Sequence, residues 1–266
     1  NFLTQRYCSY FSLKNKKKLF VYDENVIQFT FSKIKSKIDK VIHLAAITNA
    51  EQSINNKKEL IKNNLEGTKK VVNFCKKKKI PLIFASSTSV YGDQFKVINS
   101  KNNQYPNMIK PQSPYAICKV YEEKYIKDNL KNFTILRLGT ICGISEGMRF
   151  HTAINKFCYQ AVLSKPITVW RKLYTKQRPY LVLEDFIRLI NFILLKKNIF
   201  GTFDAVTENC SVVSIIKMIN LYKHKLKIKF VNTKILNQKS YIVIPDEIIK
   251  KGFKFNGDVK NEIKKT

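Results

Sequence analysis

Several features that mark common protein classes are absent from the 266 residues of the chain. No uninterrupted apolar stretch approaches the roughly 18 residues of a membrane-spanning helix, and we expect no signal peptide. The six cysteines form no C-x-x-C pair, which is typical of reduced thiols in a cytoplasmic protein. Three histidines are too few and too scattered for a zinc site, and His43, inside an apolar run, is interpreted as a packed core residue. We therefore expect a cytoplasmic protein with no metal and no membrane association.

Arginine is scarce, although the net charge is +30. Only six of the 49 basic residues are arginine, the residue best suited to specific phosphate and base contacts. The lysines are spread in short runs such as Lys76–Lys79, which favours solvated helix faces over a nucleic-acid surface. Nucleic-acid binding is kept as the weaker alternative, and attraction for anionic substrates follows from either interpretation.

Short apolar runs alternate with longer segments of helical spacing in the first half of the chain. The runs at Val41–Leu44, Leu82–Ala85 and Thr134–Leu138 are typical of strands buried on both faces. Helices are predicted at Asn63–Cys75 and Pro114–Leu130, the second with a proline in its first turn. This alternation predicts an α/β fold with a doubly wound parallel sheet.

Beyond Gly143 the alternation becomes less regular and predicts a smaller C-terminal α/β lobe. We expect a main domain over residues 1–145 and the lobe over residues 146–266, interleaved with the last strands and helix of the main sheet near 178–204. Helices are predicted at Phe150–Leu163, Glu184–Leu195, Ser211–Leu221 and near Pro245–Lys250, and strands at Ile167–Trp170, Phe200–Asp204, Ile228–Val231 and Tyr241–Ile244.

Tyr115 and Lys119 form a Y-x-x-x-K pattern in the first turns of the second predicted helix. Four-residue spacing places the phenol and the ammonium on one helix face. The pKa of a free tyrosine is ~10, and a neighbouring ammonium together with a cationic nicotinamide ring lowers it, so that the tyrosine can act as a base. The pattern alone is a weak signal, since an ordinary exposed helix pair has the same spacing.

A hydroxyl-rich turn follows the second apolar run, within Ile83–Gly92. Ligands of a doubly wound sheet lie at the carboxyl ends of its strands. Ser87 and Thr88 would lie there and could hold a substrate hydroxyl. An ordinary Ser/Thr turn is the alternative when these residues are considered by themselves.

Taken together, Ser87, Tyr115 and Lys119 resemble the Ser-Tyr-Lys triad of the short-chain dehydrogenase/reductase family. The surrounding residues resemble the extended branch of that family, the NAD-dependent nucleotide-sugar epimerases and dehydratases, and the resemblance covers nearly the whole chain. The other segments that carry it are Tyr22-Asp23, Asp39–Ala46, Asn64–Thr68, Leu136–Gly143, Arg178–Asp185 and Ser240–Val243. The resemblance implies a Rossmann-like fold.

The resemblance also implies NAD as the cofactor, a nucleoside-diphosphate sugar as the substrate, and a homodimer formed through the helices after Asn64 and Pro114. The implied catalytic residues are Ser87, Tyr115 and Lys119. Cofactor contacts are implied for Asp23, Leu44, Ala45, Ala46, Asn64, Tyr115 and Lys119, and substrate contacts for Ser87, Thr88, Thr140, Asn155 and Arg178. Arg178 would grip the diphosphate, the group that a guanidinium fork suits best, whereas Asn155 is equally well a surface residue of its helix.

Thr88 and Ser89 bear on the type of reaction. Members of this family that dehydrate or decarboxylate sugars usually carry an acidic residue there, and a hydroxyl cannot replace it. We therefore expect an NAD-dependent epimerase that oxidises a sugar hydroxyl, at C4, and returns the hydride to the other face. Thr140 stands where such epimerases often have Asn, which leaves the sugar contacts open. The alternatives are a dehydratase or reductase of the same family, and a non-catalytic dinucleotide- or nucleic-acid-binding protein.

The family's G-x-x-G-x-x-G turn, which brings backbone amides and a helix N-terminus to the pyrophosphate, does not occur in the sequence. Asn1–Thr4 resembles the loop after the family's second strand. We therefore expect that roughly 30 to 40 residues, about one βαβ unit, precede it, including the central strand of the sheet. We also expect the chain by itself to be unstable and unable to hold the cofactor tightly, because two strands would keep unpaired backbone groups.

Overall fold

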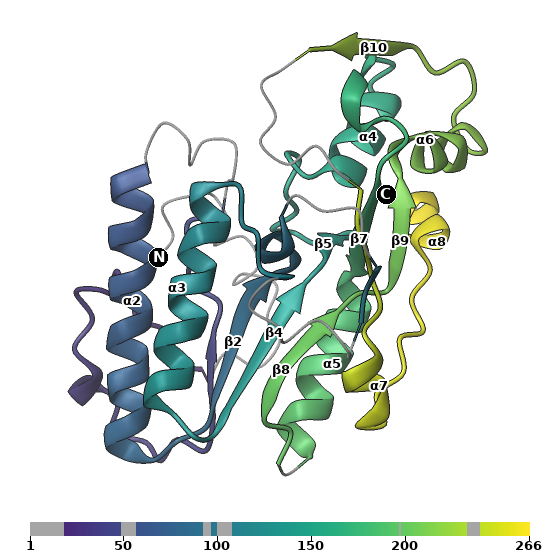
Figure 1. Ribbon diagram of the computed structural model, residues 1–266. Coiled ribbons are helices and arrows are strands. Elements are labelled where there is room, and N and C mark those ends of the chain that lie inside the picture. Colours follow the sequence, from purple (N-terminus) through teal and green to yellow (C-terminus); the bar gives the residue numbers. More distant parts are fainter. Residues whose placement is uncertain (1–18, 49–56, 93–96, 100–107, 197, 233–239) are drawn as a thin grey trace.

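The computed structural model describes residues 19–48, 57–92, 97–99, 108–196, 198–232 and 240–266. Within them the main sheet consists of β1 (Val41–His43), β2 (Leu82–Ser87), β4 (Phe133–Leu138) and β8 (Gly201–Ala205), in the order β1-β2-β4-β8 (Figure 1). Each neighbouring pair is parallel. The predicted parallel sheet is confirmed, whereas the interleaving of the lobe with the main sheet near residues 178–204 stays a prediction.

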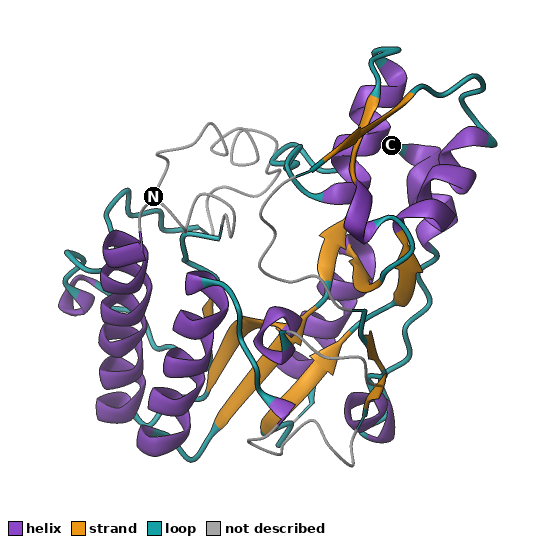
Figure 2. Cartoon of the chain, turned by 45° about the horizontal axis from the view of Figure 1, so that its top comes forward, coloured by secondary structure: helices purple, strands orange, loops and turns teal. Residues whose placement is uncertain are grey.

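Helices cover both faces of this sheet. α2 (Lys57–Lys78) and α3 (Pro114–Asn129) lie side by side in Figures 1 and 2, and their apolar residues form one buried cluster with Leu82 and Phe84. α5 (Leu183–Leu195) belongs to a second cluster, which contains Ile83. Because neighbouring residues of a strand point to opposite faces, these clusters lie on opposite sides of β2, and the doubly wound architecture is confirmed.

α2 begins six residues before the predicted Asn63 and ends at Lys78. Leu60, which is only 1% exposed, continues the buried face toward the N-terminus. Glu59 in the first turn and three lysines in the last turn complement the helix dipole. The lysines at 76–79 are exposed, which agrees with their interpretation as a solvated helix face.

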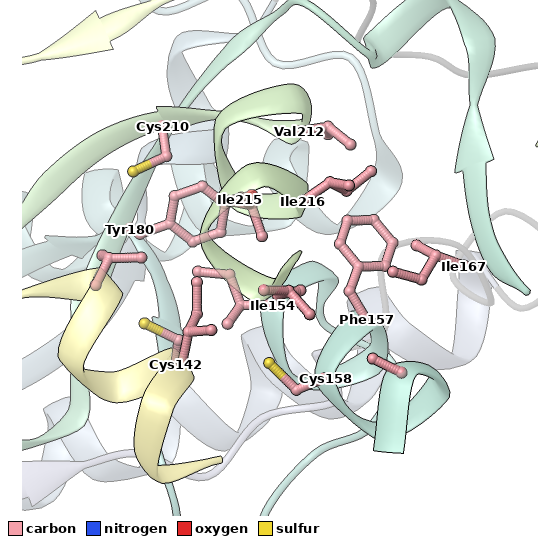
Figure 3. Close-up of a cluster of buried hydrophobic side chains, with 14 of the residues drawn as sticks. Cys142, Ile154, Phe157, Cys158, Ile167, Tyr180, Cys210, Val212, Ile215 and Ile216 are labelled. Atoms are coloured by element: carbon pink, nitrogen blue, oxygen red, sulfur yellow. The ribbon is translucent and has the colours of Figure 1, made fainter. Parts of the chain in front are cut away.

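The C-terminal lobe has its own apolar cluster, shown in Figure 3. It gathers residues of α4 (Ala153–Val162), α6 (Val212–Asn220) and α8 (Val259–Lys265). Ser211 and Ser214 form a capping box at the start of α6, in which each side chain accepts the other residue's backbone N–H. The sequence predicts α6 to within one residue at each end.

Short strands, one short helix and 3-10 helices complete the part of the chain that the structure describes. β5 (Thr140–Cys142) pairs in parallel with β7 (Gln177–Val182), and β7 pairs antiparallel with β9 (Glu208–Ser211). The other elements are β6 (Ile167–Trp170) paired with β10 (Ile228–Val231), β11 (Ile242–Val243) paired with β3 (Val97–Ile98), the helix α7 (Asp246–Lys250), and the 3-10 helices η2 (Phe31–Lys33), η4 (Thr88–Tyr91) and η6 (Arg171–Leu173).

The sequence does not predict β7, β9 or α8. In β7, Pro179 has no N–H to donate to the ladder, so the segment does not resemble a strand. α8 spans only seven residues and depends on the side chain of Asp258, which accepts the backbone N–H of Asn261. The predicted helix at Phe150–Leu163 begins only at Ala153. The domain boundary near residue 145 stays a prediction.

The described cysteines, Cys75, Cys118, Cys142, Cys158 and Cys210, are buried free thiols, as the sequence predicts. Cys8 and the predicted loop at Asn1–Thr4 lie outside the described residues. Among the helices that the structure describes, none combines the length and the apolar character of a membrane span. The same residues contain no cluster of three or more side chains suited to a metal ion.

Candidate active site

The turn after β2 places hydroxyl groups at the carboxyl end of the main sheet. Ser87, the last residue of β2, accepts hydrogen bonds from the backbone N–H of Ser89 (3.2 Å) and from its hydroxyl (2.9 Å). Because both bonds are accepted, the hydroxyl proton of Ser87 can still be donated to a ligand. The turn ends at Gly92 (φ 61°), where a Cβ would lie 1.5 Å from the carbonyl oxygen of Lys110, so glycine is required.

The first turns of α3 bring the candidate base and its cation together. Ser113 caps the helix by accepting the N–H of Ala116 (3.1 Å), and Pro114 occupies the first turn. Nζ of Lys119 lies 5.8 Å from the centre of the Tyr115 ring. The prediction that the phenol and the ammonium share a helix face is confirmed.

Lys119 lies inside the protein, with 2% of its residue surface exposed. Its Nζ lies 4.4 Å from the centre of the Phe84 ring on β2 and 3.1 Å from Oε2 of Glu122. Glu122 is fully buried and is not among the residues predicted from the sequence. Its i+3 spacing from Lys119 is the available signal, but the adjacent Glu123 leaves open which of the two carboxylates turns inward.

The pKa of Tyr115 is raised above its usual value, because burial disfavours the phenolate more than the charges of Lys119 and Arg149 favour it. Lys119 acts in the expected direction, and the lowering of the Tyr115 pKa that is expected from Lys119 together with a nicotinamide ring stays a prediction. Arg149, in the segment after β5, is a second cation near Tyr115 that the sequence does not predict. It donates a hydrogen bond to the hydroxyl of Thr48, beyond β1.

The chain after β1 forms a loop that is fixed by α2. Asn64, which is 1% exposed, accepts the backbone N–H of Ile47 (2.7 Å) and donates to the carbonyl oxygen of the same residue (2.9 Å). Leu44 and Ala45 are exposed and Ala46 is half-buried. The loop therefore presents its backbone at the carboxyl end of the sheet, while a direct contact from Asn64 to a cofactor stays a prediction.

Two series of contacts involve Asn155 and Arg178, which are both predicted to bind the substrate, near the carboxyl end of the main sheet. Asn155 of α4 is 4% exposed and donates to the carbonyl oxygen of Arg149 (3.1 Å), while its Oδ1 has no partner within the described part of the chain. The guanidinium of Arg178 on β7 lies 5.3 Å from the centre of the Tyr241 ring. Burial raises the pKa of Tyr241, while Arg178 and the side chain of Thr88 lower it. Tyr241 is thus a further residue of the site that the sequence does not single out.

The remaining candidates differ in how available they are to a ligand. Thr88 is buried and donates to the carbonyl oxygen of Leu138 (3.2 Å), so its hydroxyl is engaged within the protein. Thr140 is exposed at the start of β5, and Asp23 is exposed before η2. Their predicted contacts with the sugar and with the cofactor stay predictions.

The chain matches one family model and is similar to several known proteins. The model of the NAD dependent epimerase/dehydratase family matches residues 9–204. The dTDP-D-glucose 4,6-dehydratase of Dictyostelium discoideum is 27% identical over 198 residues, which cover 71% of this chain and 45% of the relative. The ADP-L-glycero-D-manno-heptose-6-epimerase of Brachyspira hyodysenteriae is 27% identical over 208 residues, 76% of this chain and 64% of the relative. The chain thus spans about half to two thirds of the length of these curated relatives.

Solved structures share the fold. The UDP-glucuronic acid 4-epimerase from Bacillus cereus, in complex with UDP-glucuronic acid and NAD, superimposes with a TM-score of 0.79 at 23% identity, covering 91% of this chain and 78% of that one. The UDP-N-acetylglucosamine 4-epimerase from Methanobrevibacter ruminantium, in complex with UDP-N-acetylmuramic acid, gives 0.78 at 20% identity, covering 92% and 80%.

Proposed function

Because the chain belongs to the NAD-dependent epimerase/dehydratase family, we propose that it is an NAD-dependent nucleotide-sugar epimerase acting at C4. The observation that carries the proposal is the assembly of Ser87, Tyr115 and Lys119 at one end of the sheet. Ser87 leads into η4, which contacts α3, and α3 holds Tyr115 with the ammonium of Lys119 5.8 Å from its ring. This is the arrangement that removal of a proton from a sugar hydroxyl needs.

Tyr115 acts as the base in the proposed reaction. Its phenolate takes the proton from the ring hydroxyl, and the hydroxyl of Ser87 hydrogen-bonds the same oxygen and stabilises the developing carbonyl. The charges of Lys119 and Arg149 lower the pKa of Tyr115, whereas burial raises it. A further positive charge at the site would bring the phenolate closer to neutral pH.

The residues present fit the nicotinamide end of NAD. The loop after β1, held by the two bonds from Asn64 to Ile47, presents the backbone of Leu44–Ala46, and Tyr115 and Lys119 are the remaining residues that would hold the cofactor. When bound, NAD supplies the acceptor for the hydride that leaves the sugar carbon and the donor that returns it.

The substrate is proposed to be a nucleoside-diphosphate sugar. Arg178 would hold the diphosphate, since its guanidinium fork matches phosphate oxygens, and Tyr241 supports that guanidinium at 5.3 Å. Asn155 carries a buried amide oxygen without a partner in the described residues, and a donor on the nucleotide would satisfy it. After oxidation the keto-sugar turns over, so that the hydride returns to its other face.

Two side chains favour epimerisation over dehydration. Elimination of water needs a carboxylic acid beside the base, but the positions after Ser87 carry only hydroxyls. Thr88 donates to Leu138 (3.2 Å), and Ser89 donates to Ser87 (2.9 Å). A dehydratase would accumulate a 4-keto-6-deoxy sugar, and a reductase would consume NADH. A homodimer through α2 and α3 stays a prediction.

The test is to supply the purified full-length protein with NAD and a panel of nucleoside-diphosphate sugars and to identify the products by NMR. We expect the C4 epimer, without net change in NADH. Tyr115→Phe should lower kcat by roughly 100- to 10,000-fold, because general base catalysis contributes about that much. The matched control is Tyr121→Phe on the same helix, where the residue is 52% exposed and loss of the hydroxyl should leave kcat unchanged. Turnover that survives Tyr115→Phe would overturn the assignment.

A further inference from the structure

Glu122 occupies a fully buried position one helical turn beyond Lys119. Its Oε2 lies 3.1 Å from Nζ of Lys119, and its Oε1 accepts the hydroxyl of Thr68 on α2 (2.5 Å). The same Thr68 oxygen lies 3.0 Å from Nε2 of His43 on β1. Three elements, α3, α2 and β1, therefore fix the carboxylate in one orientation beside the ammonium.

Burial alone would discharge Lys119, since an ammonium out of water loses its hydration. Although burial lowers the pKa of Lys119, the negative charge of Glu122 raises it above its ordinary value. Glu122 thus keeps Lys119 charged as well as in place. Its own second oxygen is bound by Thr68, which supplies the additional hydrogen bond that a buried ion pair requires.

The carboxylate of Glu122 shifts the pKa of Tyr115 in the opposite direction to the ammonium of Lys119. The groups that face Tyr115 are Cys118, Lys119 and Glu122 of α3, and Arg149 of the segment after β5. Burial raises the pKa of Tyr115 most; Lys119 and Arg149 then lower it, while Glu122 and Cys118 raise it. Glu122 therefore cancels part of the activation that Lys119 provides.

The neighbouring Glu123 shows that only one of two adjacent buried carboxylates contacts Lys119. Glu123 is also buried, but it points to Arg137 (3.0 and 2.7 Å) and accepts the hydroxyl of Ser86 (2.6 Å), with Lys127 at 3.6 Å. It is absent from the groups that act on Tyr115. The helix thus carries two adjacent buried carboxylates, of which one serves the candidate site and the other serves the sheet.

We propose that Glu122 is a positioning residue of the site: its carboxylate, held by Thr68, fixes the ammonium of Lys119 beside Tyr115 and offsets part of its positive charge. The inference rests on the proposed role of Tyr115 as the base. It implies that Glu122 sets how strongly the charge of Lys119 acts on Tyr115.

The test is a spectrophotometric titration of Tyr115 in the protein with no substrate added. The phenolate absorbance of each protein is recorded against pH, and the curve of the same protein carrying Tyr115→Phe is subtracted. Glu122→Gln should lower the pKa of Tyr115, by on the order of one unit, because it removes a negative charge but keeps the side-chain shape. Glu123→Gln is the matched control and should leave that pKa unchanged. An unchanged or higher pKa in Glu122→Gln would overturn the proposal.

A second pair of variants covers the case in which Glu122→Gln does not fold, since it leaves the ammonium buried without its partner. Lys119→Met is compared with Lys119→Met combined with Glu122→Gln, which removes both buried charges. The pKa of Tyr115 should be lower in the double variant than in Lys119→Met, and equal values would overturn the proposal. This titration needs no turnover, so its failure is distinguishable from failure of the proposed function, which the product analysis and Tyr115→Phe decide.

Discussion

The interior between α2, α3 and the main sheet differs in kind from the interior of the C-terminal lobe. The first, the charged interior, buries His43, Thr68, Lys119, Glu122, Glu123 and Arg137 at 4% exposure or less. The second, the lobe core, consists of apolar side chains and thiols around Tyr180 and Ile215 (Figure 3). The first region thus adds buried ionic pairs to an apolar cluster, whereas the second cluster consists of apolar side chains and thiols.

Burial of apolar surface and burial of charge stabilise a protein under different conditions. Apolar burial stabilises a protein roughly in proportion to the area removed from water, and the lobe core relies on it. A buried charge loses its hydration and needs an ionic partner and further hydrogen bonds to offset that loss. The charged interior meets this condition at Lys119–Glu122 (3.1 Å) and Arg137–Glu123 (2.7 Å), and it contains the candidate catalytic lysine. One of the two buried pairs thus holds the candidate catalytic lysine, and the other joins α3 to β4.

The largest expected effect is loss of a single buried ion. Arg137→Met should lower the free energy of unfolding by about 4 kcal/mol, because Glu123 remains buried without its partner. Urea denaturation followed by circular dichroism measures it. The control is Lys124→Met on the same helix, whose pair with Asp128 is exposed and should contribute little. Similar losses of unfolding free energy in both variants would show that the buried and the exposed ion pair do not differ in their contribution to stability.

The second largest expected effect is a dependence of the free energy of unfolding on pH, which originates in the charged interior. Burial, and then the charge of Lys119, lower the pKa of His43 from 6.5 to about 4. The unfolded state therefore binds more protons than the folded state between these values, so stability is fully present above pH 6.5 and is lost as the pH falls toward 4. The loss should reach roughly 3 kcal/mol at about 1.4 kcal/mol per unit.

His43→Gln removes this titrating group. Urea denaturation at a series of pH values between neutrality and about 4 should then show a shallower loss of stability than the unmodified protein shows. Carboxylates contribute to both proteins alike, so the difference between the two curves isolates His43. Identical curves would mean that the imidazole is protonated inside the folded protein.

The smallest expected effect lies in the lobe core. Ile215 is fully buried, and Ile215→Val should lower the free energy of unfolding by about 1 kcal/mol, through one lost methylene and the small cavity left behind. The loss should be the same at every pH at which His43 titrates, because the lobe core acts through burial of hydrocarbon. A pH-dependent loss would show that the two interiors are energetically coupled.

Local periodicity was sufficient for much of the fold. The strands at Ile167–Trp170 and Ile228–Val231 have the predicted bounds, and the apolar runs before Ser87 and Leu138 form neighbouring strands of the parallel sheet. These predictions succeed because alternation of side chains along a strand, and apolar spacing along a helix, are properties of adjacent residues. The strand Gln177–Val182 escapes prediction because Pro179 removes a donor and its partners lie in distant segments.

In the candidate site, too, some features follow from local spacing and others depend on residues that are remote along the chain. The spacing of Tyr115 and Lys119 on one helix determines that the phenol and ammonium lie together, and the structure agrees at 5.8 Å. The role of Glu122 depends on a hydrogen bond from Thr68, 54 residues earlier in the chain. No local pattern distinguishes it from Glu123, which turns toward Arg137 on β4.

The sequence by itself determined the alternating α/β architecture and the placement of Tyr115 and Lys119 on one helix face, because both depend on residue type and short-range spacing. Only the tertiary structure decided which glutamate meets Lys119, that Arg149 joins Tyr115, and that the pKa of Tyr115 is raised. Burial and electrostatic interaction depend on distances between side chains that are remote along the chain, and those distances exist only once the elements have packed.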